Sequence, residues 1–248
     1  MSDAGAPILD LRGITVRFGG LTAVARVDLQ VRAGETVGLI GPNGAGKTTL
    51  FNVITGTLRP DEGTVHLRGQ RIDGLRPSAV ARRGVRRTYQ IVRPFAGLSV
   101  LDNVLLGALF SRAGRATTAA TRGRAREMLA IVGLADKLDL PARDLNLAEK
   151  KKLDLARALA AEPAVLLLDE VLAGLNPTEI DRSLDLLERI HAAQGVTIVM
   201  VEHVMRAIMR ISHRVVVLHH GEKIADGAPQ AVARDGRVIE AYLGEPIA

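Results

Sequence analysis

The chain has 248 residues, of which 47% are hydrophobic and 24% charged, and this composition excludes a disordered chain. The length predicts one large domain or a core with an inserted subdomain. It contains no cysteine, which excludes a disulfide framework, a thiol nucleophile and a cysteine-ligated metal site. The net charge is +6, with 12 basic and two acidic residues in residues 71–126, but aromatics make up only 2%, so we expect no nucleic-acid partner.

The N-terminal part favours strands. Residues 1–15 lack a basic stretch followed by an apolar run, so we expect no signal peptide. Residues 8–18, 27–31 and 36–40 are alternating or continuously apolar and predict strands, with a turn at residues 32–35. No apolar run reaches the ~18 residues of a membrane span, so we expect a chain that is soluble by itself.

A glycine-rich segment, residues 41–48, separates the third strand from a helix that we expect to run to about Gly56. A turn at residues 60–63 then leads into a short strand at residues 64–67. These elements complete a β-rich first part of the chain.

Residues 90–161 are predicted to be mostly helical. A capping-box pattern at Ser99 begins a helix through Leu109, and a further helix ends before Pro163. Residues 114–123, which are polar and rich in Arg, Thr and Ala, predict a connection between helices.

Strands and helices alternate again after this region. Asn176 as N-cap, Pro177 at the first helical position and Glu179 two residues later predict the start of a helix. The alternation predicts a parallel sheet with crossover helices. The expected strands are residues 165–168, 196–201 and 214–219, and the expected helices are residues 177–193 and a segment from about Val204.

The glycine-rich segment matches G-x-x-x-x-G-K-[ST] in its required place between a strand and a helix. Its glycines let backbone N–H groups point at phosphate oxygens, and the helix N-terminus adds partial positive charge. We expect Lys47 to contact the β- and γ-phosphates and Thr48 to bind Mg²⁺. The residues expected to bind the nucleotide here are Gly41, Pro42, Asn43, Gly44, Ala45, Gly46, Lys47, Thr48 and Thr49.

Two carboxylates follow the apolar strand at residues 165–168. In open parallel sheets, ligands bind at the carboxyl ends of the strands. We expect Asp169 to hold Mg²⁺, usually through water, and Glu170 to orient and polarise an attacking water. An acidic pair at a strand end is by itself usually a solvated helix start, but a phosphate-binding loop in the same chain favours the functional interpretation.

Taken in order, these motifs resemble the ATP-binding subunits of ABC transporters over nearly the whole chain. The resemblance implies an α/β fold: an ABC-type P-loop NTPase domain with an N-terminal antiparallel β-subdomain and an inserted helical subdomain. It implies a single domain with its core in residues 1–90 and 162–248 and helices in about residues 91–161. The matching positions are an aromatic (Phe18), Walker A (residues 41–48), a Q-loop glutamine (Gln90), a signature segment (residues 145–149), Walker B (residues 165–169), a catalytic glutamate (Glu170), a D-loop (residues 173–177) and a switch histidine (His203).

The resemblance also implies roles and cofactors. Phe18 would stack on adenine, Gln90 would reach Mg²⁺ and the lytic water, and His203 would donate to the γ-phosphate and help hold Glu170. The residues expected to take part in catalysis are Glu170, His203, Gln90 and Lys47. The expected cofactors are ATP and Mg²⁺. Two such subunits close face to face, so that each ATP lies between one Walker A loop and the partner's signature.

The signature segment departs from the usual Leu-Ser-Gly-Gly-Gln. Asn146 can still cap a helix and donate through its amide, but Glu149 adds negative charge near a polyphosphate, partly offset by residues 150–152. Val171 also replaces the proline usual after the catalytic glutamate. We therefore expect the site formed by this signature to be slow or altered. Its nucleotide-facing residues are expected to be Asn146, Ala148 and Glu149.

Within the family, residues 18–24, 87–90, 173–177 and 239–244 are similar to ATPase subunits of branched-chain amino acid importers. This implies an ATPase that powers import of branched-chain or related amino acids through a separate membrane permease, with a periplasmic or extracellular solute-binding protein acting indirectly. The chain would lie peripherally at the cytoplasmic face of the membrane. The branch includes urea and amide transporters, so the solute stays open, as does the choice between homodimer and heterodimer.

Two alternatives remain. The basic stretch favours a soluble, non-transport ABC ATPase, and the altered signature favours a weakly hydrolysing regulatory nucleotide sensor. If the chain is a transporter subunit, we expect the basic stretch to face the permease and anionic lipid headgroups. The arginines expected on that face are Arg82, Arg83, Arg86 and Arg87.

Overall fold

The computed structural model describes residues 5–109 and 118–243. Its larger sheet has the strand order β10-β9-β3-β8-β7-β6. All neighbouring strands in it are parallel except β10 and β9, which confirms the predicted parallel core. These strands are β3 (Thr36–Ile40), β6 (Val85–Thr88), β7 (Val165–Asp169), β8 (Thr197–Val201), β9 (Arg214–His219) and β10 (Glu222–Gly227).

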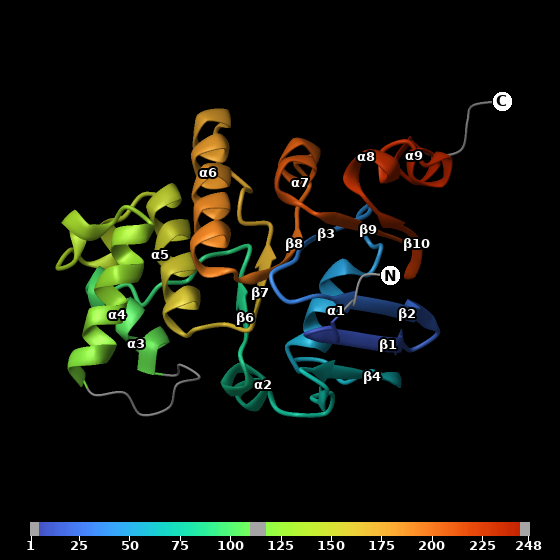
Figure 1. Cartoon of the computed structure of the whole chain (residues 1–248), viewed down its shortest axis with the longest axis horizontal. Coiled ribbons are helices and arrows are strands. Elements are labelled where there is room, and N and C mark those ends of the chain that lie inside the picture. The colour runs from blue at the N-terminus through green and yellow to red at the C-terminus, as the bar shows by residue number, and fades with distance from the viewer. Residues whose placement is uncertain (1–4, 110–117, 244–248) are drawn as a thin grey trace.

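A second, antiparallel sheet contains the N-terminal strands and lies beside the first (Figure 1). Helix α1 (Lys47–Ile54) packs between the two sheets, with Leu50, Phe51 and Ile54 fully buried in a core formed with strands of both. The first turn of α1 is therefore held at the carboxyl ends of the parallel strands. The order of the second sheet is β2 (Leu21–Val31), β1 (Leu9–Phe18), β4 (Glu62–Leu67) and β5 (Gln70–Arg71).

The inner strands β3, β7 and β8 of the parallel sheet are buried on both faces, which explains why they are largely apolar. In β7, Val165 and Leu167 belong to the core around α1, whereas Leu166 and Leu168 belong to the core that contains the long helices. The carboxyl end of β7 emerges between these two cores. Asp169 and Glu170 are thus presented from a rigid strand.

Three helices, α3 (Val100–Leu109), α4 (Thr118–Ile131) and α5 (Leu147–Ala160), pack on one another at one side of the molecule, on the left in Figure 1. Among the described residues, no helix combines the length and the apolar character that crossing a membrane requires. The other helices are α2 (Pro77–Arg83), α6 (Pro177–Gln194), α7 (Met205–Ile211), α8 (Pro229–Val232) and α9 (Gly236–Leu243), with short 3₁₀ turns at Ala135–Lys137 and Ala142–Asp144.

The predicted helix starts are confirmed. The Ser99 hydroxyl accepts a hydrogen bond from the Asp102 N–H at 3.0 Å just before α3. At α6, the Asn176 side chain accepts from the Glu179 N–H, and the Glu179 carboxylate accepts from the Asn176 N–H. Both caps satisfy N–H groups that lack partners within the helix.

The prediction for residues 114–123 is wrong from Thr118 onward, because α4 begins there; residues 114–117 lie outside the described residues. Ala125, Met128 and Leu129 of α4 are fully buried against α3 and α5, so tertiary packing stabilises this Arg-rich and Thr-rich helix. In the similarity motif at residues 239–244, Gly244 likewise lies outside the described part.

Strand β2 begins at Leu21 rather than at Val27. Its pairing with β1 shifts register near Arg26, which has a φ of +48°. This irregularity interrupts the alternation of apolar residues and hides the first part of the strand from a sequence pattern. β6 was missed for another reason, since three of its four residues are Arg or Thr.

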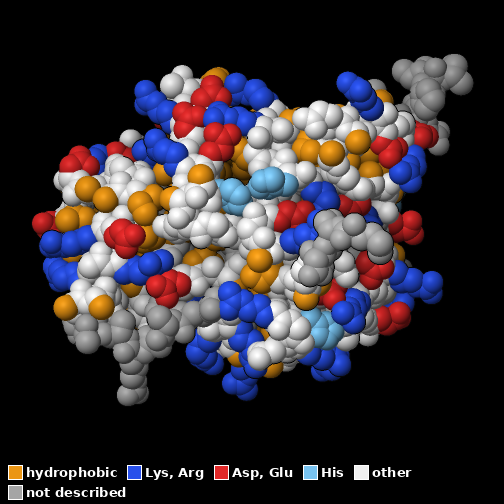
Figure 2. All heavy atoms as spheres, viewed as in Figure 1, with side chains coloured by type: hydrophobic (Ala, Val, Ile, Leu, Met, Phe, Trp, Pro, Cys, Tyr) orange, Lys and Arg blue, Asp and Glu red, His pale blue; other side chains and the backbone are white. Residues whose placement is uncertain are grey.

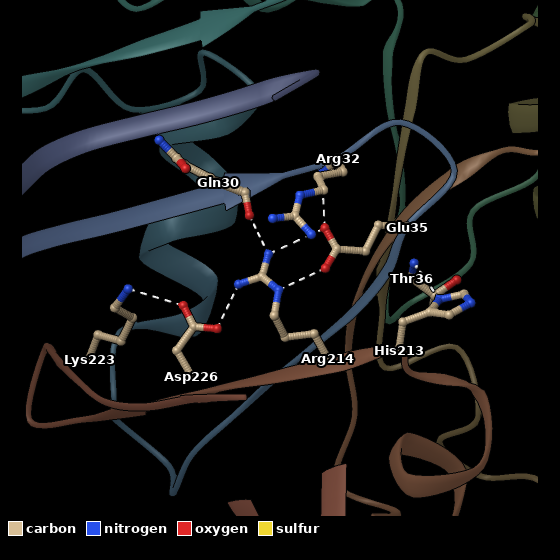
Figure 3. Close-up of polar contacts among 8 residues, drawn as sticks. All are labelled: Gln30, Arg32, Glu35, Thr36, His213, Arg214, Lys223 and Asp226. Atoms are coloured by element: carbon tan, nitrogen blue, oxygen red, sulfur yellow. Dashed lines mark hydrogen bonds and ion pairs between the residues drawn. The ribbon is translucent and has the colours of Figure 1, made fainter. Parts of the chain in front are cut away.

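An arginine ties the edge of the parallel sheet to β2 (Figure 3). Arg214 of β9 donates to Glu35 at 2.7 Å and to Asp226 of β10 at 2.6 Å, and it also donates to the Gln30 carbonyl in β2. Because Arg214 is mostly buried and surrounded by acceptors, the cluster fixes how the two sheets meet.

Candidate active site

The loop between β3 and α1 is shaped by glycines in close contact with backbone. Gly41 and Gly46 have φ values of +149° and +100°. A Cβ atom on Gly41 would lie 2.1 Å from the Leu218 carbonyl oxygen, and one on Gly46 would lie 2.6 Å from the Ala23 carbonyl oxygen. Since backbone atoms cannot move aside, the loop is seated firmly against β9 and β2.

Lys47, the first residue of α1, is buried within this loop at 6% exposure. Its Nζ atom donates to the carbonyl oxygens of Gly41 at 2.6 Å and Pro42 at 2.9 Å. Burial lowers the pKa of the Lys47 ammonium, while the charges of Glu170 and Asp169 act to raise it. The loop thus holds a cation close to the carboxyl end of β7.

Glu170 is held from two sides by residues that the sequence predicted as its catalytic companions. Gln90 Nε2 donates to Glu170 Oε2 at 2.6 Å, and His203 Nε2 lies 3.0 Å from Glu170 Oε1. The three residues follow the ends of the neighbouring strands β6, β7 and β8. The structure therefore brings together three positions far apart in the chain.

The backbone at Glu170 is in the left-handed region, with a φ of +48°, and its N–H donates to the Val201 carbonyl at 2.9 Å. A residue with a side chain seldom adopts this conformation unless its surroundings impose it, and such positions concentrate at functional sites. Here the constraint comes from the parallel strand β8.

Asp169 ends β7 and is 7% exposed. Its Oδ2 atom accepts a hydrogen bond from Arg87 Nη2 at 2.5 Å. The expectation that Arg87 lies on an outward basic face is wrong, because its side chain is only 6% exposed and forms an ion pair with Asp169. The charge can be buried because a carboxylate accompanies it.

The other expected arginines differ from Arg87. Arg82 and Arg83 at the end of α2 are exposed, whereas Arg86 is half-buried. Lys and Arg side chains gather along the lower edge of the view in Figure 2, where Figure 1 places α2. The outward basic surface therefore includes α2 but not the inward-facing arginine of β6.

A cavity of about 840 Å³ adjoins these groups. Thr48, Gln90, Asp169 and Glu170 line it together with Arg87, so the expected Mg²⁺ residues share one space. Large apolar side chains that are more than half exposed lie at the same place: Tyr89, Ile91 and Phe95. The cavity thus joins the carboxylates to an apolar surface at the Q-loop, the segment of residues 89–95 around Gln90.

Phe18 ends β1 and is 52% exposed, which leaves its ring open to a ligand. It does not line the cavity beside Glu170. The prediction that Phe18 stacks on adenine stays a prediction.

The signature residues form the start of α5. Asn146 accepts from the Glu149 N–H at 2.9 Å, and Glu149 accepts from the Asn146 N–H at 3.1 Å. Glu149 also forms an ion pair with Lys137, and this contact lowers the pKa of its carboxyl group. Its main partner is therefore Lys137 rather than the three lysines that follow it, of which Lys152 adds a smaller effect. Asn146, Ala148 and Glu149 do not line the cavity beside Glu170.

Two residues with no predicted role at Glu170 hold the chain directly after it. Lys151 of α5 donates to the Val171 carbonyl at 2.8 Å, and Glu202 accepts from the Leu172 N–H at 2.7 Å. Glu202 is 3% exposed, and burial raises the pKa of its carboxyl group to about 7. An acidic residue directly after the apolar run of residues 198–201 and directly before His203 was the available signal.

Comparison with protein families identifies two matching models. The model described as ABC transporter matches residues 24–173, and the model described as branched-chain amino acid ATP-binding cassette transporter matches residues 222–248. Two similar proteins are named high-affinity branched-chain amino acid transport ATP-binding proteins. LivG of Salmonella typhimurium is 39% identical over 251 residues, with 96% of this chain and 98% of LivG covered. BraF of Pseudomonas aeruginosa is 40% identical over 252 residues with the same coverage.

Solved structures give the same result. The ADP conformation of an ATP-binding cassette of an ABC transporter superposes with a TM-score of 0.85 at 28% identity, covering 96% of this chain and 99% of that one. A dimeric post-hydrolysis cassette bound to ADP and Pi superposes with a TM-score of 0.77 at 25% identity, covering 89% and 98%. The predicted α/β fold, with its antiparallel sheet and added helices, is confirmed.

Proposed function

Because this chain belongs to the ABC transporter family, we propose that it is the ATP-hydrolysing subunit of an importer for branched-chain or related amino acids, which acts through a separate membrane permease. The observation that carries the proposal is the Glu170 carboxylate, held by Gln90 and His203 beside the phosphate-binding loop. The names of the LivG and BraF relatives support the solute class. The matching family models and these relatives are named for transport and give no support to the non-transport alternative.

In hydrolysis, Glu170 orients and polarises the attacking water, because its two oxygens are already directed by Gln90 and His203. Lys47 stabilises the negative charge of the β- and γ-phosphates from within the loop. His203 keeps Glu170 in place and donates toward the γ-phosphate. Phe18 supports the adenine through its exposed ring.

Mg²⁺ fits the oxygen donors at the cavity: the Thr48 hydroxyl, the Asp169 carboxylate and the Gln90 amide. When bound, the ion neutralises charge on the phosphate oxygens. Among the described residues, no group of three or more His, Asp or Glu side chains is arranged to hold a metal by itself, which agrees with an ion shared with the nucleotide.

We further propose a dimer with a second ATPase subunit at the cytoplasmic face of the membrane. A heterodimer is favoured, because a partner with the usual signature would complete this chain's Walker A site. The apolar side chains Tyr89, Ile91 and Phe95 would meet the permease, and a solute-binding protein would act through that permease.

The test is ATP turnover and leucine uptake in vesicles that contain this chain, its partner ATPase and the permease. We expect turnover that rises when the permease is present, and uptake that stops in Glu170→Gln. Turnover near zero with and without the permease would instead identify a nucleotide sensor. Normal turnover without uptake of amino acids or amides would contradict the transport proposal.

A further inference from the structure

Arg87 lies where three elements of the nucleotide site meet. Its Nη2 atom donates to Asp169 at the end of β7, and its Nη1 atom donates to Asn52 of α1 at 2.7 Å. Asn52 is four residues after Thr48 on the helix that begins in the phosphate-binding loop. Gln90, which holds Glu170, follows Arg87 by three residues. One guanidinium thus connects the Q-loop, the P-loop helix and the Walker B carboxylate.

The surroundings of Arg87 fix its orientation. The guanidinium carbon lies 5.5 Å from the centre of the Phe51 ring and 5.1 Å from the centre of the Tyr89 ring. A cation held between aromatic rings and away from solvent depends strongly on its carboxylate. Its Nε atom is buried without a hydrogen-bond partner in the described residues, so the contacts to Asp169 and Asn52 are the polar ones that direct it.

Building on the proposed function, we propose that Arg87 is a positioning residue that serves as a resident cation for Asp169 and competes with Mg²⁺ for this carboxylate. Asp169 offers its charge to Arg87 through Oδ2, in a site that is nearly closed to solvent. Two cations close to one carboxylate repel each other, and a low local dielectric strengthens that repulsion. Arg87 therefore loosens its hold on Asp169 when nucleotide and Mg²⁺ bind.

The response has a defined route. The backbone of β6 is paired with β7, Arg87 opposite Leu167 and Thr88 opposite Leu168, so it is held in the sheet. The parts that can move when Mg²⁺ binds at Asp169 are the side chain of Arg87 and the segment after Thr88. Tyr89 rests against Arg87, and Gln90 contacts Glu170. Binding at Asp169 is thereby linked to the Q-loop, whose exposed apolar residues lie on the same cavity.

The test measures Mg²⁺ binding rather than turnover. The full chain is saturated with a non-hydrolysable ATP analogue and titrated with MgCl₂ by calorimetry. Arg87→Met should reach half-saturation at about tenfold lower Mg²⁺, because the competing charge is gone. Arg87→Lys keeps a cation and should stay within about twofold of the wild type. Arg83→Met, an exposed arginine on α2, is the matched control and should not shift.

A second variant covers the case in which Arg87→Met fails to fold. Asn52→Ala removes one anchor of Arg87 without touching Asp169, so Mg²⁺ should bind about threefold more tightly. An unchanged or raised Mg²⁺ requirement in folded Arg87→Met and in Asn52→Ala would overturn the proposal. Failure of the proposed function is seen in a different measurement, because a nucleotide sensor or a non-transport ATPase would still bind Mg²⁺ and nucleotide here but would fail the turnover or uptake test.

Tyrosine emission supplies an independent signal, because the chain has two tyrosines and no tryptophan. In a Tyr242→Phe background, Tyr89 is the remaining tyrosine and contacts Arg87 directly. Addition of Mg²⁺ to the nucleotide-bound protein should change its emission, and Arg87→Met should remove this change. The same emission response in Arg87→Met would overturn the link from Asp169 to the Q-loop.

Discussion

The Walker edge and the signature edge, the two regions of this chain proposed to face nucleotide, use their polar residues in opposite ways. At the Walker edge, Gln90 and His203 both direct the Glu170 carboxylate toward the cavity. At the signature edge, Asn146 and Glu149 bond to each other's backbone and start α5. The first edge is therefore prepared for chemistry within a single chain, whereas the second is committed largely to helix stability. This difference explains how an altered signature can occur in the same chain as an ordered arrangement of Gln90, Glu170 and His203.

The largest effect should come from Glu170→Gln. We expect turnover to fall by about 10³-fold, the middle of the range for loss of a general base, while ATP binding remains because the loop and Lys47 are untouched. The matched variant at the other edge is Glu149→Gln, which should change turnover less than about threefold. Both variants are compared with the wild type in steady-state turnover and in nucleotide binding. Normal turnover in Glu170→Gln would remove the role given to this residue.

The pH dependence of stability separates Glu202 from its neighbours. Its carboxyl pKa is raised to about 7, so the folded chain holds this proton more tightly than the unfolded chain. Stability from this group is present at low pH and falls as pH rises from about 4.5 to about 7, by roughly 3 kcal/mol. Lys151 and Glu170 are the charged groups that act on it.

Urea unfolding at several pH values tests this slope. Glu202→Gln cannot ionise, so its stability should lack this fall between pH 5 and pH 7. Glu222→Gln, at an exposed position of β10, is the control and should follow the wild type. A difference between wild type and Glu202→Gln that does not vary with pH would show that Glu202 is not the titrating group.

The sequence was sufficient for elements whose signal is local. The apolar strands, the glycine-rich loop and the helix starts at Ser99 and Asn176 depend on neighbouring residues, and all were predicted. The first part of α4, residues 118–123, was assigned to a connection because the helix is stabilised by burial of Met128 and Leu129 against other helices. β6 was missed because its arginines hide a strand whose partner is more than 70 residues away.

The residues of the site divide in the same way, into those that a sequence motif predicts and those whose position depends on tertiary contacts. The order of motifs predicted Gln90, Glu170 and His203, and the structure places them together. The burial of Arg87 depends on Asp169, and the pairing of Glu149 with Lys137 depends on how the start of α5 packs. Neither pairing leaves a spacing pattern in the sequence. Charge alone therefore assigned Arg87 to the wrong surface.

A variant of Lys151 tests whether α5, the helix that begins in the signature segment, supports the Walker edge. Its Nζ atom holds the Val171 carbonyl directly after Glu170, so Lys151→Met should lower turnover by about tenfold while ATP binding changes little. Lys152→Met, the next residue in the same helix, is the control and should stay within about twofold. Equal losses in both variants would show that the positive charge of the helix matters rather than this contact.

The smallest effects come from two equivalent helix caps. Asn146 begins α5 and Asn176 begins α6, each with a complete capping box. Replacing either residue by Ala should cost about 1 kcal/mol of stability, measured by urea unfolding. Replacement by Asp keeps the cap but adds a negative charge and removes the amide donor.

The aspartate variants distinguish a cap from a nucleotide contact. If Asn146 also meets ATP bound by a partner subunit, Asn146→Asp should lower turnover of the assembled complex several-fold while stability is kept, because its charge repels phosphate. Asn176→Asp should change neither. Equal turnover in the two aspartate variants would mean that Asn146 acts only as the start of α5, and the contrast between the two edges of the site would then be complete.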